Sequence, residues 1–193
     1  MFSYSSYFSS WLGHCLDNKV VYGAERPGQP KPNPDMPSTP RGPSVPSHVV
    51  DQWCAHMRSK GVKRVLCLLS DPELSFYSDP LLPQLAAHFE TSAPPGGTLP
   101  KGERVLRIEP HAEDALVTTV ACLKAAVAAQ EPVVVFCSTG QARTGMVLSF
   151  WLHHAYALSI AAAVRNQKSE HPFSSSSSYC IKNLLSHAKW LRN

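Results

Sequence analysis

Short apolar runs and segments of helical periodicity follow one another along the chain. Apolar runs bounded by polar or turn-forming residues predict four β-strands, at residues 19–23, 62–70, 104–108 and 133–136. Apolar residues three or four positions apart predict α-helices at residues 48–60, 79–89, 114–129, 144–155, 159–167 and 179–192. This order predicts an α/β fold, in which a small, mostly parallel central sheet is flanked by helices.

Proline and glycine mark the segments between these elements. Prolines are concentrated between residues 27 and 47, where large apolar residues are nearly absent, and we expect an insertion there in place of a packed element. Residues 71–77 are turn-like. We therefore divide the chain into an N-terminal extension, residues 1–18, and a single domain, residues 19–193, that carries the Pro-rich insertion.

Composition and charge narrow the function classes. Of the 193 residues, 44% are hydrophobic, which is enough for the core of one domain. A balance of 18 basic and 14 acidic residues gives a net charge of +4, too small and too scattered to indicate nucleic-acid binding. No apolar run has membrane-spanning length, and the N-terminus lacks the pattern of a secretory signal. The six cysteines are not spaced in pairs, so we expect a cytoplasmic monomer in a reducing compartment.

The apolar run at 133–136 leads directly into a cysteine, a short loop and an arginine that opens a helix. Backbone N–H groups of such a loop, together with the positive end of the helix, can bind an anion, and Arg143 can hold two of its oxygens. The same field favours the nucleophilic thiolate of Cys137. The pattern predicts a phosphate-binding loop between a central strand and a helix. The loop residues are Ser138, Thr139, Gly140, Gln141 and Ala142.

The spacing of Cys137, five residues, Arg143 and then Thr144 resembles the signature of the cysteine-dependent protein tyrosine and dual-specificity phosphatases. The resemblance implies that Cys137 attacks phosphorus and that Arg143 holds the phosphoryl oxygens. It also implies that Thr144 stabilises the thiolate as it leaves the phosphoenzyme.

Further segments are similar to a small microbial-type subgroup of the dual-specificity phosphatases. They are residues 21–28, Trp53 and residues 61–69. The similarity covers roughly residues 20–166, with the Pro-rich stretch as an insertion.

The chain departs from the family pattern at three positions. Phe136 stands where the family usually has His, and loss of the imidazole would remove hydrogen bonds that order the loop and keep the thiolate ionised. Ala142 replaces a loop glycine, which the backbone accepts if φ stays negative. Pro110 falls where the family carries the Asp that protonates the leaving oxygen.

The neighbours of Pro110 are the candidates for a general acid. Glu109 is adjacent and is the provisional acid, if its longer side chain reaches the loop. Glu113, Asp114 and His111 are further candidates, although a helix N-cap is the favoured role for Asp114.

Two functions from different classes remain open. The first is a phosphatase that forms a cysteinyl-phosphate intermediate and favours phosphotyrosine-type leaving groups, which need little protonation. The second is a catalytically weak or inactive pseudophosphatase with a regulatory role, suggested by Phe136 and Pro110. Either would bind a phosphorylated protein or a small phosphomonoester. Thiol chemistry needs no cofactor, and His153 and His154 lack the spacing of a metal pair, so neither a cofactor nor a metal is expected.

Overall fold

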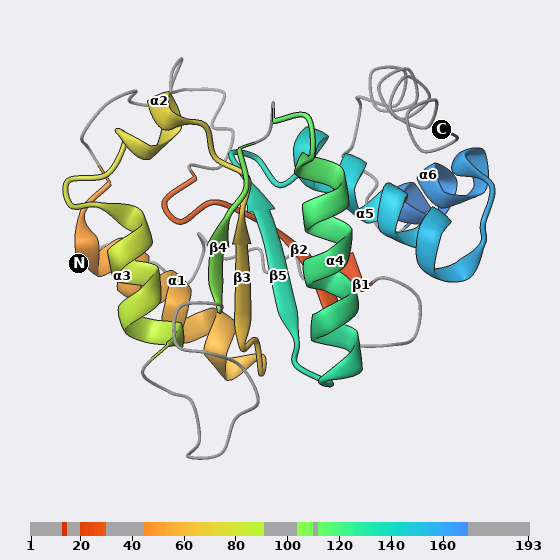
Figure 1. The fold of residues 1–193 in the computed structure, drawn as a ribbon. Helices are drawn as coiled ribbons and strands as arrows, with labels where there is room; N and C mark the ends of the chain where they lie inside the picture. The colour runs from red at the N-terminus through yellow and green to blue at the C-terminus, as the bar shows by residue number, and fades with distance from the viewer. Residues whose placement is uncertain (1–12, 15–19, 30–44, 91–103, 110–111, 170–193) are drawn as a thin grey trace.

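A computed structural model of the chain describes residues 13–14, 20–29, 45–90, 104–109 and 112–169 (Figure 1). The strands are β1 (Gly13–His14), β2 (Val21–Glu25), β3 (Arg64–Cys67), β4 (Val105–Arg107) and β5 (Val133–Cys137). The helices are α1 (Ser47–Ser59), α2 (Asp71–Leu74), α3 (Leu81–Phe89), α4 (Ala115–Ala128), α5 (Ala142–Tyr156) and α6 (Ile160–Ser169). Within these ranges no helix combines the length and the apolarity needed to cross a membrane.

The strands form one five-stranded sheet in the order β1-β2-β5-β3-β4. Strands β2, β5, β3 and β4 are parallel, and β1 runs antiparallel to β2 at one edge. The carboxyl end of β5 therefore lies between those of β2 and β3, at the upper edge of the sheet in Figure 1. Open parallel sheets bind their ligands beyond this edge. The predicted α/β fold with a mostly parallel central sheet is confirmed.

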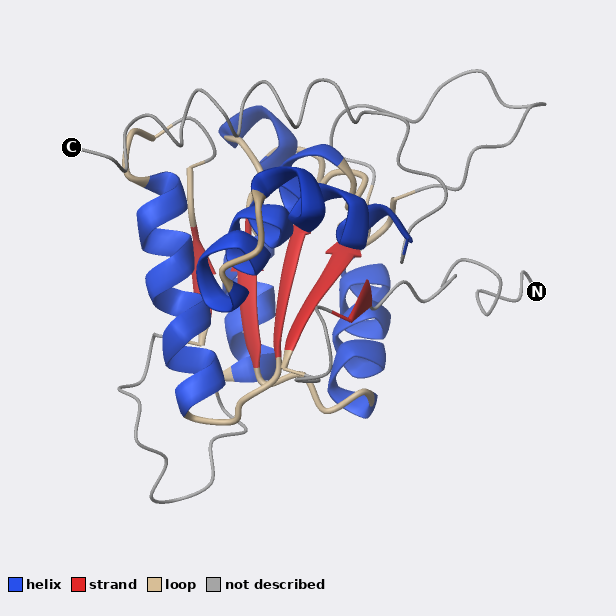
Figure 2. Ribbon diagram, turned by 90° about the vertical axis from the view of Figure 1, so that its right-hand side faces the viewer, coloured by secondary structure: helices blue, strands red, loops and turns tan. Residues whose placement is uncertain are grey.

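Helices cover both faces of the sheet (Figures 1 and 2). On β5, Val134 and Phe136 pack into the core formed with α1 and α3. Val133, Val135 and Cys137 pack on the opposite face, in the core formed with α4, α5 and α6. Because both faces are buried, the strand is apolar at every position, as its sequence indicates.

The observed elements differ from the predicted ones mainly at their bounds. The strand predicted at 62–70 is paired as a strand only over β3. The turn-like residues 71–77 begin with α2, a single helical turn that Ser70 and Glu73 stabilise through their side chains. Its capping box binds the first N–H groups of the turn, which explains why so short a helix forms.

The N-terminal extension, the Pro-rich insertion and the C-terminal helix were also predicted from the sequence. Residues 13–14, within the predicted N-terminal extension, form β1 and pair with β2. Residues 30–44 of the Pro-rich insertion and the helix predicted at 179–192 lie outside the described residues.

Candidate active site

The cysteine loop, residues 137–143, joins the end of β5 to the first turn of α5. Both neighbouring strands hold this connection through backbone hydrogen bonds. From the β3 side, the N–H of Leu68 donates to the carbonyl of Phe136 at 2.9 Å, and from the β2 side the N–H of Arg26 donates to Ser138 at 3.2 Å. The loop is thus fixed at the carboxyl edge of the sheet, directly before the positive N-terminal end of α5.

Cys137 is the last residue of β5, and the residue is 1% exposed. It is a free thiol that packs on the same face of the sheet as α4 and α5. Cys67 on β3 is also buried but packs on the opposite face. Burial raises the pKa of Cys67 to about 12, so this second thiol is protonated and unreactive near neutral pH.

Gly140 adopts a backbone conformation that the loop requires. Its φ is +69°, in the left-handed region that residues with a side chain rarely adopt. A Cβ at this position would lie 2.7 Å from the carbonyl atoms of Ala24 and 2.8 Å from the backbone nitrogen of Glu25. The backbone at the end of β2 therefore leaves space only for glycine, and the sequence-based choice of Gly140 as a loop residue has a steric basis.

Arg143 lies in the first turn of α5, and its guanidinium is held by two residues, Leu68 and Glu73. Its Nη1 donates to the carbonyl of Leu68 at 2.7 Å and to Glu73 Oε2 at 2.6 Å, while Nη2 donates to Glu73 Oε1 at 2.5 Å. Such a two-pronged carboxylate pair fixes the plane of a guanidinium. Hydrogen bonding to Glu73 raises the pKa of Arg143, and a thiolate at Cys137 acts in the same direction.

Glu73 is fixed in turn by the start of α2. Its Oε2 accepts from the backbone N–H and from the hydroxyl of Ser70, each at 2.9 Å. Burial raises the pKa of Glu73, but the hydrogen bonds from Arg143 and Ser70 outweigh it and bring the pKa to about 2. The carboxylate is therefore ionised at any ordinary pH.

Glu73 is a site residue that the sequence alone does not reveal. The pattern of Ser70, two residues and Glu73 is that of a capping box, so a helical turn was predictable at this point. The partner Arg143 lies 70 residues further along the chain, and no local pattern reveals that contact.

Phe136 occupies the position of the absent His and is fully buried. Its ring meets that of Trp53 on α1 edge-on, with the ring centroids 5.3 Å apart. The indole N–H of Trp53 donates to the carbonyl of Glu25 at 3.2 Å. The aromatic pair therefore packs beneath the ends of β5 and β2, and it supplies no hydrogen bond to the cysteine loop.

Glu109, the provisional general acid, is engaged with an arginine. Its carboxylate accepts a hydrogen bond from Nη2 of Arg107, which also pairs with Asp71 at 2.8 Å. Nε of Arg107 donates to the carbonyl of Leu69 at 3.2 Å. Arg107 thus joins the segment after β4 to the turn that carries Glu73.

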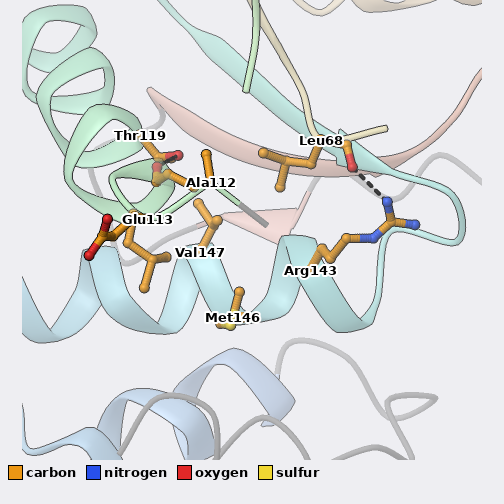
Figure 3. A pocket seen from close by; sticks show the side chains of 9 residues that line it. Leu68, Ala112, Glu113, Thr119, Arg143, Met146 and Val147 are labelled. Atoms are coloured by element: carbon orange, nitrogen blue, oxygen red, sulfur yellow. Dashed lines mark hydrogen bonds between the residues drawn. The ribbon is translucent and has the colours of Figure 1, made fainter. Parts of the chain in front are cut away.

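The other acid candidates lie further along the chain. Asp114 occupies the N-cap position of α4, as expected, but its carboxylate accepts from the Thr118 side chain at 3.3 Å and binds no backbone N–H of the helix. Glu113 is exposed and lines a small cavity of about 30 Å³ beside the stem of Arg143. In Figure 3 its carboxylate lies at the other end of this cavity from the Arg143 guanidinium. Pro110 and His111 lie outside the described residues.

The remaining loop residues differ in exposure. Thr139 and Gln141 are exposed, whereas Ser138 and Ala142 are half-buried. Thr144 is fully buried, and its hydroxyl has no hydrogen-bond partner among the described residues. A buried hydroxyl normally has a partner, so a polar group of a bound ligand would stabilise it.

No protein-family model matches the chain, and no curated protein matches its sequence. Solved structures do match its fold. PTPMT1 in complex with PI(5)P superposes with a TM-score of 0.55 at 11% identity, over 88% of this chain and 95% of that one. The PTP-2 phosphatase of Cydia pomonella gives a TM-score of 0.53 at 14% identity, over 89% and 86%. TpbA of P. aeruginosa gives 0.51 at 16% identity, over 91% and 88%.

The chain therefore has the fold of the dual-specificity and protein tyrosine phosphatase superfamily. At these identities the likeness is one of fold. The likeness confirms the fold that the resemblance of the Cys137 to Thr144 signature implies.

Proposed function

We propose that the protein is a phosphomonoester hydrolase that works through a cysteinyl-phosphate intermediate. The observation that carries the proposal is the placement of Cys137 and Arg143 at the two ends of one loop, with Arg143 oriented by Glu73. A protein that only bound phosphate would need the guanidinium and the loop N–H groups, but it would have no chemical need for the thiol. The presence of both supports catalysis.

The reaction has two balanced steps. In the first, the thiolate of Cys137 forms a bond to phosphorus while the bond from phosphorus to the leaving oxygen breaks, and that oxygen receives a proton. Arg143 and the loop N–H groups stabilise the charge on the equatorial oxygens. In the second, water attacks phosphorus as the sulfur–phosphorus bond breaks, the acid that donated a proton in the first step takes up the proton that water loses, and phosphate and the thiolate are released. The family resemblance implies that the hydroxyl of Thr144, which has no hydrogen-bond partner among the described residues, donates a hydrogen bond to the departing sulfur.

The first step needs an acid, and Glu109 remains our proposal for it. Its carboxylate is paired with Arg107, so it must leave that contact and take up a proton before it can serve the leaving oxygen. The need for an acid is smallest when the leaving group is stable as an anion. Aryl phosphates, phosphotyrosine among them, are therefore the substrates we propose, ahead of phosphoserine and phosphothreonine.

A second candidate function is a pseudophosphatase that binds phosphorylated partners without turnover. Two observations favour it: the apolar surroundings of Phe136, which supply no hydrogen bond to the loop, and the ion pair of Glu109 with Arg107. Under this alternative the loop binds the same phosphomonoesters but releases them unchanged.

Hydrolysis of p-nitrophenyl phosphate between pH 5 and 8 separates the two candidates. The native protein is compared with Cys137→Ser and, as a control for thiol loss, with Cys122→Ser, which changes a half-buried cysteine on α4. We expect turnover by the native protein and by C122S, and none by C137S. If the native protein is no faster than C137S but still binds inorganic phosphate, the phosphatase proposal is wrong and the pseudophosphatase stands.

A further inference from the structure

Arg26 is a buried arginine next to the cysteine loop. Only 2% of it is exposed. Its guanidinium lies over the ring of Phe76, 5.1 Å from the centroid, and its Nη1 is 3.5 Å from the carbonyl oxygen of Pro27. The ion pairs formed within the described part of the chain do not include Arg26, and its Nε has no hydrogen-bond partner there.

This arrangement is costly for a charged group. A buried guanidinium is normally paired with a carboxylate, because loss of hydration is otherwise not compensated. The ring of Phe76 offers partial compensation through a cation–π contact. The hydroxyl of Tyr77 is close as well: burial raises the pKa of Tyr77, and Arg26 counteracts this rise. Neither group carries a negative charge at neutral pH, so the positive charge of Arg26 is not neutralised by these contacts.

The position of Arg26 relative to the loop suggests what this charge does. Its backbone N–H binds the Ser138 carbonyl at 3.2 Å, and the two residues before it, Ala24 and Glu25, lie against Gly140. The backbone of Arg26 is thus in direct contact with the loop, and charges in a protein act on one another over distances up to a Debye length of about 10 Å. Among the described residues near the loop, Arg143 is paired with Glu73 and Arg107 with Asp71 and Glu109, whereas no carboxylate of the described residues pairs with Arg26.

We propose that Arg26 is a second cation of the anion site, a positioning residue that acts through the cysteine loop and increases its affinity for a phosphate dianion. The inference rests on the proposed function in so far as that function places phosphate in the loop. It adds an electrostatic contribution from the other side of the loop, in a chain whose loop lacks the family's imidazole at position 136.

The test is the affinity for inorganic phosphate at pH 8, measured by titration calorimetry on the full chain, and it needs no turnover. Arg26→Met removes the charge, Arg26→Gln removes it but keeps a polar side chain, and Arg26→Lys keeps it. The matched control is Arg104→Met. Arg104 is buried to a similar degree, 7% exposed, but pairs with Glu131 at 3.0 Å immediately before β4, at the opposite edge of the sheet.

We expect R26M and R26Q to bind phosphate about ten-fold more weakly than the native protein, in keeping with the loss of one nearby charge. R26K should retain most of the affinity, and R104M should lose stability with its phosphate affinity unchanged. If R26M does not fold, the comparison of R26Q with R26K decides by the same criterion.

Two results would overturn the inference alone: native affinity in a folded R26M or R26Q, or an equal loss in R26K and R26Q, which would show that shape and not charge matters. A native protein that binds no phosphate overturns this inference together with the anion site itself. A native protein that binds phosphate but does not hydrolyse phosphomonoesters overturns only the phosphatase proposal.

Discussion

The ring of Phe136 meets the ring of Trp53 edge-on, with 5.3 Å between their centroids and 64° between their planes. The side chain at position 136 points to the α1 and α3 side of the sheet, whereas Cys137 faces α4 and α5. The residue before the cysteine is therefore a core residue in this chain. Its contribution is to stability, through the packing of the strand that carries the nucleophile.

Phe136→Ala should lower the free energy of unfolding by about 3–5 kcal/mol, because it leaves a cavity in a close-packed core. Phe136→Leu, the control, retains most of the apolar volume and should cost about 1 kcal/mol. Urea unfolding at neutral pH measures both. A loss below about 1 kcal/mol for F136A would contradict the structural role given to this ring.

Gly140→Ala should lower the affinity for phosphate at least ten-fold, because the added Cβ would collide with the backbone of Ala24. Gly61→Ala is a matched control: Gly61 also has a left-handed φ, +83°, but nothing lies within 4 Å of its Cβ position. G61A should lose about 1 kcal/mol of stability and keep its phosphate affinity. Equal phosphate affinities in G140A and G61A would show that phosphate binding does not depend on the contact between the loop and β2.

Glu73→Gln should reduce stability in a pH-dependent way. The pKa of this carboxyl falls from its ordinary 4.5 to about 2 in the folded protein, so its ionised form stabilises the fold above pH 4.5, and this contribution is lost as the pH falls from 4.5 to 2. Above pH 5 we expect E73Q to be about 1–2 kcal/mol less stable than the native protein, after allowance for solvent screening.

Unfolding by urea at a series of pH values tests this expectation. The difference between E73Q and the native protein should shrink towards zero below pH 4.5. Glu113→Gln, a change at an exposed glutamate of the same charge, serves as the control and should show no such difference. If the difference in free energy of unfolding between E73Q and the native protein stays constant down to pH 2, the assigned pairing of Glu73 with Arg143 is wrong.

Glu109→Gln and Asp71→Asn test the identity of the general acid. Both carboxylates bind Arg107, so both changes remove one of its partners, but only Glu109 is proposed to donate a proton. E109Q should slow the hydrolysis of phenyl phosphate by about 10², the lower end of what a general acid contributes, and that of p-nitrophenyl phosphate far less. D71N should affect the two substrates alike. The same response in both variants would remove Glu109 from the mechanism.

Much of the fold and the centre of the site could be predicted because their signals are local. The apolar run at 133–136, the cysteine loop and the start of α5 follow one another in the sequence, so their order alone indicates a loop at the carboxyl end of a buried strand. The bounds of β3 were harder to predict from the sequence, because residues 62–70 are apolar well beyond the part that pairs as a strand.

The contacts that orient the site could not be predicted in the same way. Glu73 meets Arg143 across 70 residues, and Arg26 meets Phe76 across the Pro-rich insertion. Such pairs depend on which strands become neighbours in the sheet, which hydrophobic periodicity does not determine. The pairing of Glu109 with Arg107 two residues away is local in sequence, but it depends on how the segment after β4 turns towards Asp71.

In the proposed reaction, Cys137 becomes phosphorylated during turnover. Rapid acid quenching of the native protein mixed with p-nitrophenyl phosphate, followed by mass spectrometry of its peptides, tests it most directly. Thr144→Ala, which removes the hydroxyl proposed to assist the second step, should increase the amount of intermediate. We predict one phosphoryl group on the peptide that contains Cys137, more of it in T144A, and none in C137S. Turnover without phosphate on this peptide, in the native protein and in T144A alike, would show that Cys137 is not the nucleophile.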